Sequence, residues 1–65
     1  MLNEIYIVKV FADFELIEEY KAIDVVKKNN IVTIIDIFGD SNNYDVDEVT
    51  IKITKYQKVK EFTID

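Results

Sequence analysis

Residues 22–35, AIDVVKKNNIVTII, decide the fold, because two runs rich in β-branched residues meet there at Asn29 and Asn30. Isoleucine, valine and threonine favour extended strands. Asparagine tolerates the positive φ of a tight turn better than most residues do. We therefore interpret this stretch as a β-hairpin, and residues 31–38, IVTIIDIF, as its clearest strand.

The segment just before this turn, residues 15–28 (ELIEEYKAIDVVKK), also has some features of a helix. Asp13 would serve as its N-cap, with glutamates near the start and lysines near the end, as the helix dipole prefers. However, successive steps of about 100° spread its apolar side chains around the whole circumference, whereas a helix on a small sheet needs one apolar stripe. We favour strands here. The alternative is an α+β fold, β-α-β-β, with a helix near residues 14–28.

Two further segments alternate as strands do. Residues 4–12, EIYIVKVFA, are apolar on both faces, and residues 49–55, VTIKITK, direct Val49, Ile51 and Ile53 to one side. In the first segment, one face carries Tyr6, Val8, Val10 and Ala12, and the other carries Ile5, Ile7 and Phe11 beside Lys9.

The remaining segments complete the expected fold. Residues 39–43, GDSNN, have the composition of a turn, and residues 58–65, KVKEFTID, suggest a short edge strand with Val59, Phe62 and Ile64. The sequence therefore predicts a single domain, residues 1–65. Its expected class is all-β, a small antiparallel sheet or meander of about five strands.

The acidic stretch between residues 36 and 48 is the first candidate binding site. It holds Asp36, Asp40, Asp45, Asp47 and Glu48, and it contains no lysine. One interpretation is a patch that docks on a basic protein surface. The other is a solvated connection in which Asp45 and Asp47 flank Val46 on a short strand. The candidate partner-binding residues are Asp40, Tyr44, Asp45, Asp47, Glu48 and Tyr56, since tyrosine is a frequent energetic anchor at interfaces.

The composition argues against catalysis and against a bound metal or cofactor. The chain has no cysteine and no histidine, which removes thiolate chemistry, imidazole bases and the best zinc ligands. An EF-hand loop starting at Asp40 would have Tyr44, Asp45 and Ile51 at positions that require an oxygen ligand, glycine and glutamate. We therefore expect a non-enzymatic protein with no cofactor and no metal site.

The net charge of −5 and the absence of arginine disfavour direct binding to nucleic acid. A locally basic, aromatic C-terminal segment keeps a small nucleic-acid binder as an alternative; it contains Lys52, Lys55, Tyr56, Lys58, Lys60 and Phe62. No uncharged run approaches the roughly 18 residues of a membrane span, and no secretory leader is recognisable. We expect a cytoplasmic protein without a membrane partner.

Residues 6–38, YIVKVFADFELIEEYKAIDVVKKNNIVTIIDIF, followed by YDVDEVTIKI at 44–53, resemble short β-sheet proteins encoded by phages and mobile elements of low-GC bacteria. Such proteins are often anti-defence factors. The resemblance implies a compact, non-enzymatic, frequently dimeric inhibitor that occludes a host defence protein, and hence a location in the host cytoplasm. The alternative is a structural or regulatory interaction domain with no inhibitory role.

The first strand predicts a homodimer. Because one sheet that curls on itself covers only its inner face, we expect a second copy to cover Ile5, Ile7 and Phe11. Burial of each such side chain contributes about 1.5–3 kcal/mol, which is comparable to the whole stability of a small domain. Light scattering at micromolar concentration should give twice the 7.6 kDa chain mass. The mass of a single chain would contradict the prediction.

Overall fold

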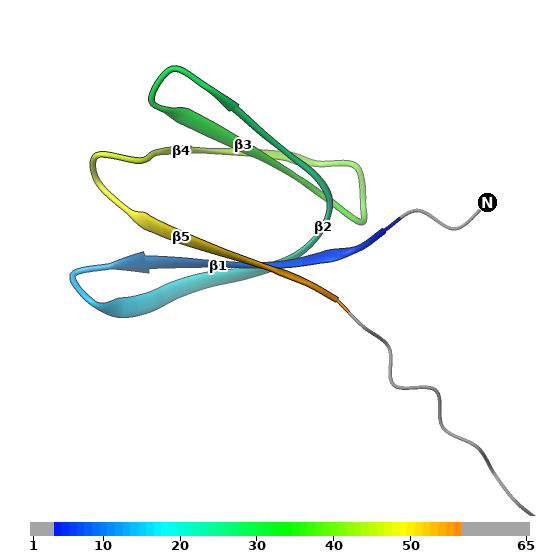
Figure 1. The fold of residues 1–65 in the computed structure, drawn as a ribbon, viewed down its shortest axis with the longest axis horizontal. Coiled ribbons are helices and arrows are strands. Elements are labelled where there is room, and N and C mark those ends of the chain that lie inside the picture. Colours follow the sequence, from blue (N-terminus) through cyan, green and yellow to red (C-terminus); the bar gives the residue numbers. More distant parts are fainter. Residues whose placement is uncertain (1–3, 57–65) are drawn as a thin grey trace, which may run out of the picture.

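The computed structural model describes residues 4–56, which form one five-stranded antiparallel sheet (Figure 1). The strands are β1 (Tyr6–Ala12), β2 (Glu15–Lys28), β3 (Ile31–Asp36), β4 (Ser41–Asp45) and β5 (Thr50–Lys55). Their order in the sheet is β4-β3-β2-β1-β5, so the first four form a meander and β5 returns to pair with β1. The all-β prediction is confirmed, and residues 15–28 are one strand rather than a helix.

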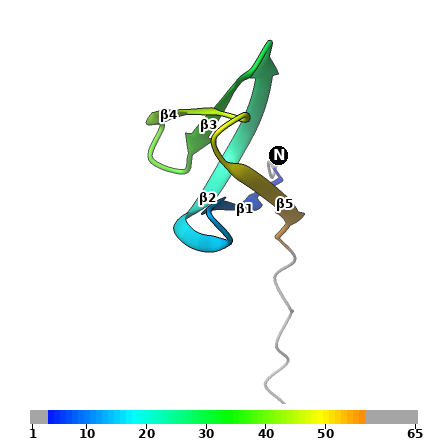
Figure 2. The same cartoon turned by 90° about the vertical axis from the view of Figure 1, so that its left-hand side faces the viewer.

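The long strand β2 belongs to both halves of the sheet. Its first half pairs with β1 and its second half pairs with β3. Figure 2 shows β2 curving from one half to the other. The ladder gains one extra residue, Ile17, opposite the step from Val10 to Phe11, and another, Ile23, between Ala22 and Asp24. Such β-bulges bend a strand and increase its twist, so they allow the sheet to curl over its own inner face.

These bulges explain why residues 15–28 do not alternate cleanly. Each extra residue shifts the side-chain parity, so Tyr20 and Ala22 face inward before the second bulge and Val25 faces inward after it. An ideal period of two is therefore interrupted at Ile23. Two of the apolar pairs that scattered around a helical wheel, Leu16–Ile17 and Ala22–Ile23, lie where the strand changes face.

Two-residue turns join the first three strands. The register pairs Ala12 with Glu15, leaving Asp13 and Phe14 as the turn, and both have a positive φ, 51° and 66°. Positive φ at both central residues is the pattern of a type I′ turn, whose twist matches that of the flanking strands. The second turn is Asn29 and Asn30, with φ 56° at Asn29, as the sequence predicted.

The core lies on the concave face of the curled sheet. Its buried side chains come from the three central strands: Val8, Val10, Ala22, Val32 and Ile34. Partly buried residues from β1, β2, β4, β5 and the β4–β5 connection surround them: Tyr6, Tyr20, Val25, Tyr44, Val46, Val49 and Ile51. The side of β1 that carries Val8 and Val10 is the inner one, in agreement with the predicted alternation.

Contacts across the curl hold its two halves together. The hydroxyl groups of Tyr20 on β2 and Tyr44 on β4 are hydrogen-bonded, and their rings meet edge to face with centroids 6.1 Å apart. At the end of β4, the Val46 amide donates to the carbonyl of Asn30 at 2.8 Å. The Asn30 side-chain amide in turn donates to Asp47 at 3.0 Å. β4 is thus tied to β2 and to the β2–β3 turn as well as to β3.

Several sequence predictions need correction. Residues 41–43 belong to strand β4 rather than to a turn, because pairing with β3 satisfies the hydrogen bonds of their backbone while Ser41 and Asn43 face solvent.

The strand expected around Val46 is also wrong. This segment is a turn, in which the Asp45 carboxylate accepts a hydrogen bond from the Asp47 amide. β3 ends at Asp36, two residues before the end of the strand predicted over residues 31–38. Ile53 lies opposite buried Val8, yet 51% of its surface is exposed. The predicted strand at 58–65 lies outside the described residues.

Asp36 has a structural role at the β3–β4 turn. Its Oδ1 atom accepts hydrogen bonds from the backbone amides of Phe38 and Asp40, each at 3.0 Å, and Oδ2 accepts from the Asn42 side chain at 3.3 Å. Gly39 provides the positive φ, 87°, that the turn requires. One carboxylate of the acidic stretch therefore serves to close a turn.

Replacing Asp36 tests this role. Asp36→Ala removes the acceptor of both amides and should lower the free energy of unfolding by about 1–3 kcal/mol. Asp36→Asn keeps a side-chain oxygen and should lose less than half as much. Urea unfolding measures both changes as shifts of the midpoint at constant slope. Equal losses for the two variants would mean that charge, rather than turn closure, is what Asp36 contributes.

Candidate functional site

The β1–β2 turn presents the most exposed apolar side chain of the described residues. Phe14 is wholly exposed although its backbone has a positive φ, which bulky residues rarely adopt. Such a conformation costs on the order of 1–3 kcal/mol and concentrates at functional positions. Neither core packing nor turn preference accounts for an aromatic residue here.

Further apolar side chains surround Phe14. Leu16 and Ile17 follow it on β2 and are about half exposed. Phe11 is opposite Leu16 in the register and is partly buried. We call Phe11, Phe14, Leu16 and Ile17 the tip cluster. The first bulge places Ile17 in this cluster, because an extra residue there joins two apolar side chains that strict alternation would separate.

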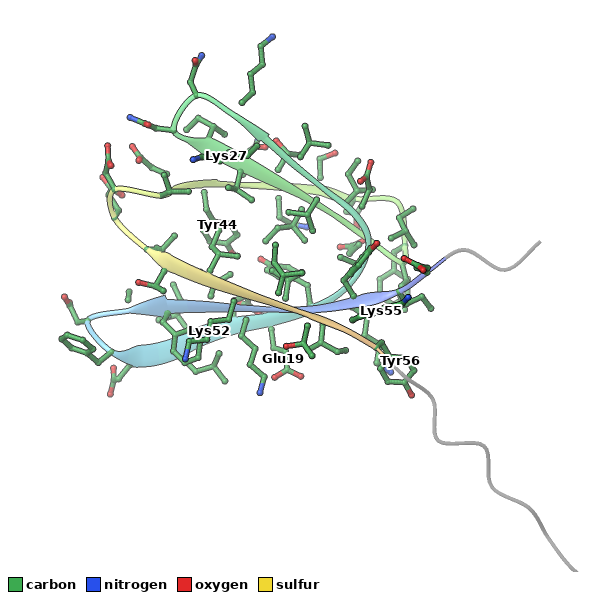
Figure 3. The ribbon with its side chains drawn as sticks, in the orientation of Figure 1. Glu19, Lys27, Tyr44, Lys52, Lys55 and Tyr56 are labelled. Atoms are coloured by element: carbon green, nitrogen blue, oxygen red, sulfur yellow. The ribbon has the colours of Figure 1, made fainter. Side chains whose placement is uncertain are left out.

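A hollow of about 510 Å³ opens beside the tip cluster, lined by Phe11, Asp13, Phe14, Thr50 and Lys52. Lys52 comes from β5, and its ammonium lies 5.3 Å from the centroid of the Phe11 ring, within reach of a cation–π contact. Figure 3 shows Lys52 and Glu19 on the outer side of the β1–β2–β5 half. The hollow thus has an apolar wall, a cation and, at Asp13, an anion.

Two acidic turns lie at the same end of the molecule as the tip cluster. The β1–β2 turn is flanked by Asp13, Glu15 and Glu18, all exposed. The β4–β5 connection brings Asp45, Asp47 and Glu48 to this end (left in Figure 1), because Thr50 at the start of β5 pairs with Phe11. An exposed aromatic tip with carboxylates nearby is complementary to a surface that combines an apolar pocket with positive charge.

The structure separates the six partner-binding residues predicted from the sequence. Asp45 ends β4 and is followed by Asp47 and Glu48, whereas Asp40 precedes the start of the strand, so roughly 17 Å of extended chain separates Asp40 from Asp45. Tyr56 lies beyond the end of β5, where the ammonium of Lys21 approaches its ring centroid at 5.8 Å. The acidic stretch is therefore two groups rather than one patch.

Tyr44 has an internal position. Figure 3 shows it between the two halves of the sheet, far from Tyr56. Its hydroxyl partner Tyr20 is partly buried, and this burial, followed by the hydrogen bond with Tyr44, raises the pKa of Tyr20 well above the ordinary value of a tyrosine. The pair contributes to the fold and leaves Tyr44 little surface for a partner.

The residues predicted for a dimer interface lie on or beside the outer side of β1. Ile7 stands between Lys21 on β2 and Thr54 on β5, and Phe11 lies below Lys52. Ile5 precedes the strand, and its carbonyl accepts from the Tyr56 amide at 2.8 Å. All three are partly buried within a single chain. The homodimer stays a prediction.

Charged side chains at the opposite end form one ion pair. Glu4 and Lys55 are 2.7 Å apart, and both are about half exposed. Hydrogen bonds from Lys55 and from the Tyr6 hydroxyl lower the pKa of the Glu4 carboxyl, although solvent screens so exposed a pair. Of the lysines in the basic C-terminal segment, Lys55 is therefore held in an ion pair, and Lys52 lies next to Phe11. Lys58, Lys60 and Phe62 lie outside the described residues.

Within residues 4–56 the acidic side chains form no group of three or more that could hold a metal ion. No helix of that part of the chain is long and apolar enough to cross a membrane. What the described side chains bring together is an exposed apolar tip with charged residues close to it.

The tip cluster is what the sequence analysis missed. Its signal is the string ADFE, residues 12–15, which joins two strand-like segments through Asp13 and Phe14. A two-residue hairpin turn normally takes glycine or asparagine at its second position, so an aromatic there contradicts local preference. Such departures from local preference are expected at functional or strained positions.

Comparison with known proteins adds no relative: no family model, curated protein or solved structure matches this chain.

Relieving the backbone strain at Phe14 should stabilise the protein. Phe14→Gly removes no buried contact and places a residue without Cβ at a positive φ, so we expect a gain of about 1 kcal/mol in thermal or urea unfolding. Phe38→Gly is the matched control, because Phe38 is also exposed, at 83%, but its φ is not positive. It should give no gain. A loss of stability in Phe14→Gly would mean that Phe14 packs against the fold.

Proposed function

We propose that this chain is a non-catalytic protein-binding module which inhibits a host defence protein by occlusion, as its resemblance to small phage proteins suggests. The observation that carries the binding role is Phe14, which is fully exposed on a backbone conformation unfavourable to it. Maintaining that arrangement weakens the fold, so a benefit outside folding is the simplest reason for it. A protein partner supplies that benefit.

The tip cluster has the features of an interface centre. Aromatic anchors that enter a pocket contribute most of the binding energy at many interfaces, and the surrounding contacts mainly exclude water. Phe14 is such an anchor, while Leu16 and Ile17 form its apolar surroundings. The two-residue turn holds the ring between two paired strands, so little conformational entropy is lost on binding.

The charges around the tip suggest the character of the partner surface. Asp13, Glu15 and Glu18 lie in or near the turn that carries the ring, and the group Asp45, Asp47 and Glu48 adds negative charge at the same end. Carboxylates at an interface rim accelerate association with a basic surface and make it sensitive to salt. Many proteins that act on nucleic acid have such surfaces, and a blocker of this kind would work by covering one.

Affinity capture with matched variants tests the proposal. The chain and its variants Phe14→Ser and Phe38→Ser, immobilised, would be exposed to lysate of a low-GC bacterium, and the bound proteins identified by mass spectrometry. We expect a nuclease, helicase or other defence protein to bind the parent and Phe38→Ser. It should be depleted at least tenfold with Phe14→Ser, the loss expected when one anchor is removed.

The other outcomes separate the alternatives. A virion or replication protein in place of a defence protein would indicate a structural or regulatory interaction domain. Recovery of nucleic acid, lost on nuclease treatment, would indicate a nucleic-acid binder. Equal recovery of a partner by all three forms of the chain would remove the tip cluster from the interface.

A further inference from the structure

The hollow beside the tip cluster is lined by residues that complement one another. Its volume is about 510 Å³, in the range of pockets that hold small molecules, so it has room for a phenyl ring. Phe11 gives it an apolar wall, and Phe14, which also lines it, is a fully exposed ring. The same few residues thus supply both an apolar projection and an apolar hollow.

The lining of this hollow also carries one charge of each sign. Asp13 is exposed in the β1–β2 turn, and Lys52 is exposed on β5. Within the described part of the chain, neither of them takes part in an ion pair. Lys52 lies directly opposite Lys9 on β1, and like charges at opposed positions of a sheet are unfavourable. Both charges are therefore available to a second molecule.

We propose that two copies of the chain meet tip to tip, each placing its Phe14 ring in the hollow of the other. A twofold interface uses the same patch on both copies, so that patch must contain its own complement. The ring of one copy packs against Phe11 of the other. Asp13 of each copy faces Lys52 of the other, which gives two ion pairs. Figure 1 shows the β1–β2 turn at one end of the sheet, where a second copy can approach it.

This interface differs from the outer side of β1, for which the sequence predicted a homodimer. Phe11, near the end of β1, belongs to both surfaces, whereas Ile5 and Ile7 lie toward the start of the strand. Ile5 and Ile7 are already partly buried within one chain, but Phe14 is fully exposed. Because the apolar contribution to association scales with the area removed from water, the tip gains more from a second copy.

The inference rests on the proposed function, because a second copy and the target protein compete for the same ring. Each copy has a net charge of −5, so the acidic groups near the two tips repel one another and weaken the dimer. A basic target surface attracts those same groups. The tip dimer therefore shields Phe14 from solvent when no target is present, and it yields to a target.

Charge reversal with mixing tests the interface. Asp13→Lys brings two positive charges together across the twofold axis, and Lys52→Asp brings two negative charges together. By sedimentation equilibrium, each variant alone should have a dimer dissociation constant at least tenfold above that of the parent. An equimolar mixture of the two variants should dimerise again, because both contacts then join a lysine to an aspartate. A monomeric parent at micromolar concentration, or a mixture no more dimeric than its separate components, would overturn the proposal.

The serine variants distinguish this proposal from the proposed function. Phe14→Ser removes no buried contact of the single chain, so it keeps the dimer testable even if the charge variants fold poorly. It should be monomeric at a concentration at which the parent and Phe38→Ser are dimers. If Phe14→Ser dimerises like the parent but no longer captures the target, the tip dimer is wrong and the proposed function stands. If it is monomeric yet captures the target normally, the dimer is supported and the role of Phe14 in target binding is wrong.

Discussion

The curl of β2 is the constraint on which the rest of the structure depends. A single sheet in so short a chain has no second layer, so its apolar face is buried only if the sheet folds over itself. β2 makes this possible because it is long enough to pair with β1 in its first half and with β3 in its second. The bulges at Ile17 and Ile23 supply the bend. Without them Val8 and Val10 would have no apolar residues of β3 above them.

The curl also determines which side chains become available to a partner. It brings Tyr44 against Tyr20, and so removes from the surface a tyrosine that the sequence suggested for binding. It moves the acidic group of the β4–β5 connection to the end that carries the β1–β2 turn, while Asp40 remains at the other. The candidate interface therefore follows from the bend in one strand rather than from the acidic stretch as a linear motif.

The sequence predicted the strands for which residue type and period agree. β3 is β-branched almost throughout, and the β2–β3 turn has two asparagines, so their hairpin was predictable. β4 was missed because Ser41, Asn42 and Asn43 have the composition of a turn, yet an edge strand needs only alternate inward residues and one paired edge. The bulges were not predictable, since an extra residue in a ladder depends on the partner strand's register and has no residue signature of its own.

The candidate site was predictable only in part for a related reason. The sequence identified negative charge and aromatic content, but the grouping of Phe14 with Leu16, Ile17 and Lys52 depends on the turn, the first bulge and the β1–β5 pairing. Phe14 itself is visible in the sequence as a departure from turn preference. Recognising it required knowing that a two-residue turn falls at Asp13 and Phe14, and this follows from the register of β1 with β2.

The pairing of β1 with β5 has a consequence for how the protein is made. β5 is the last described strand to be synthesised, and its partner is the first. Local hairpins form quickly, whereas contacts between distant parts of a chain must overcome a larger entropy of loop closure. During translation, β1 therefore has a partner strand along only one of its two edges, the edge paired with β2, until β5 leaves the ribosome. The order of synthesis thus makes β5 the strand that completes the described sheet.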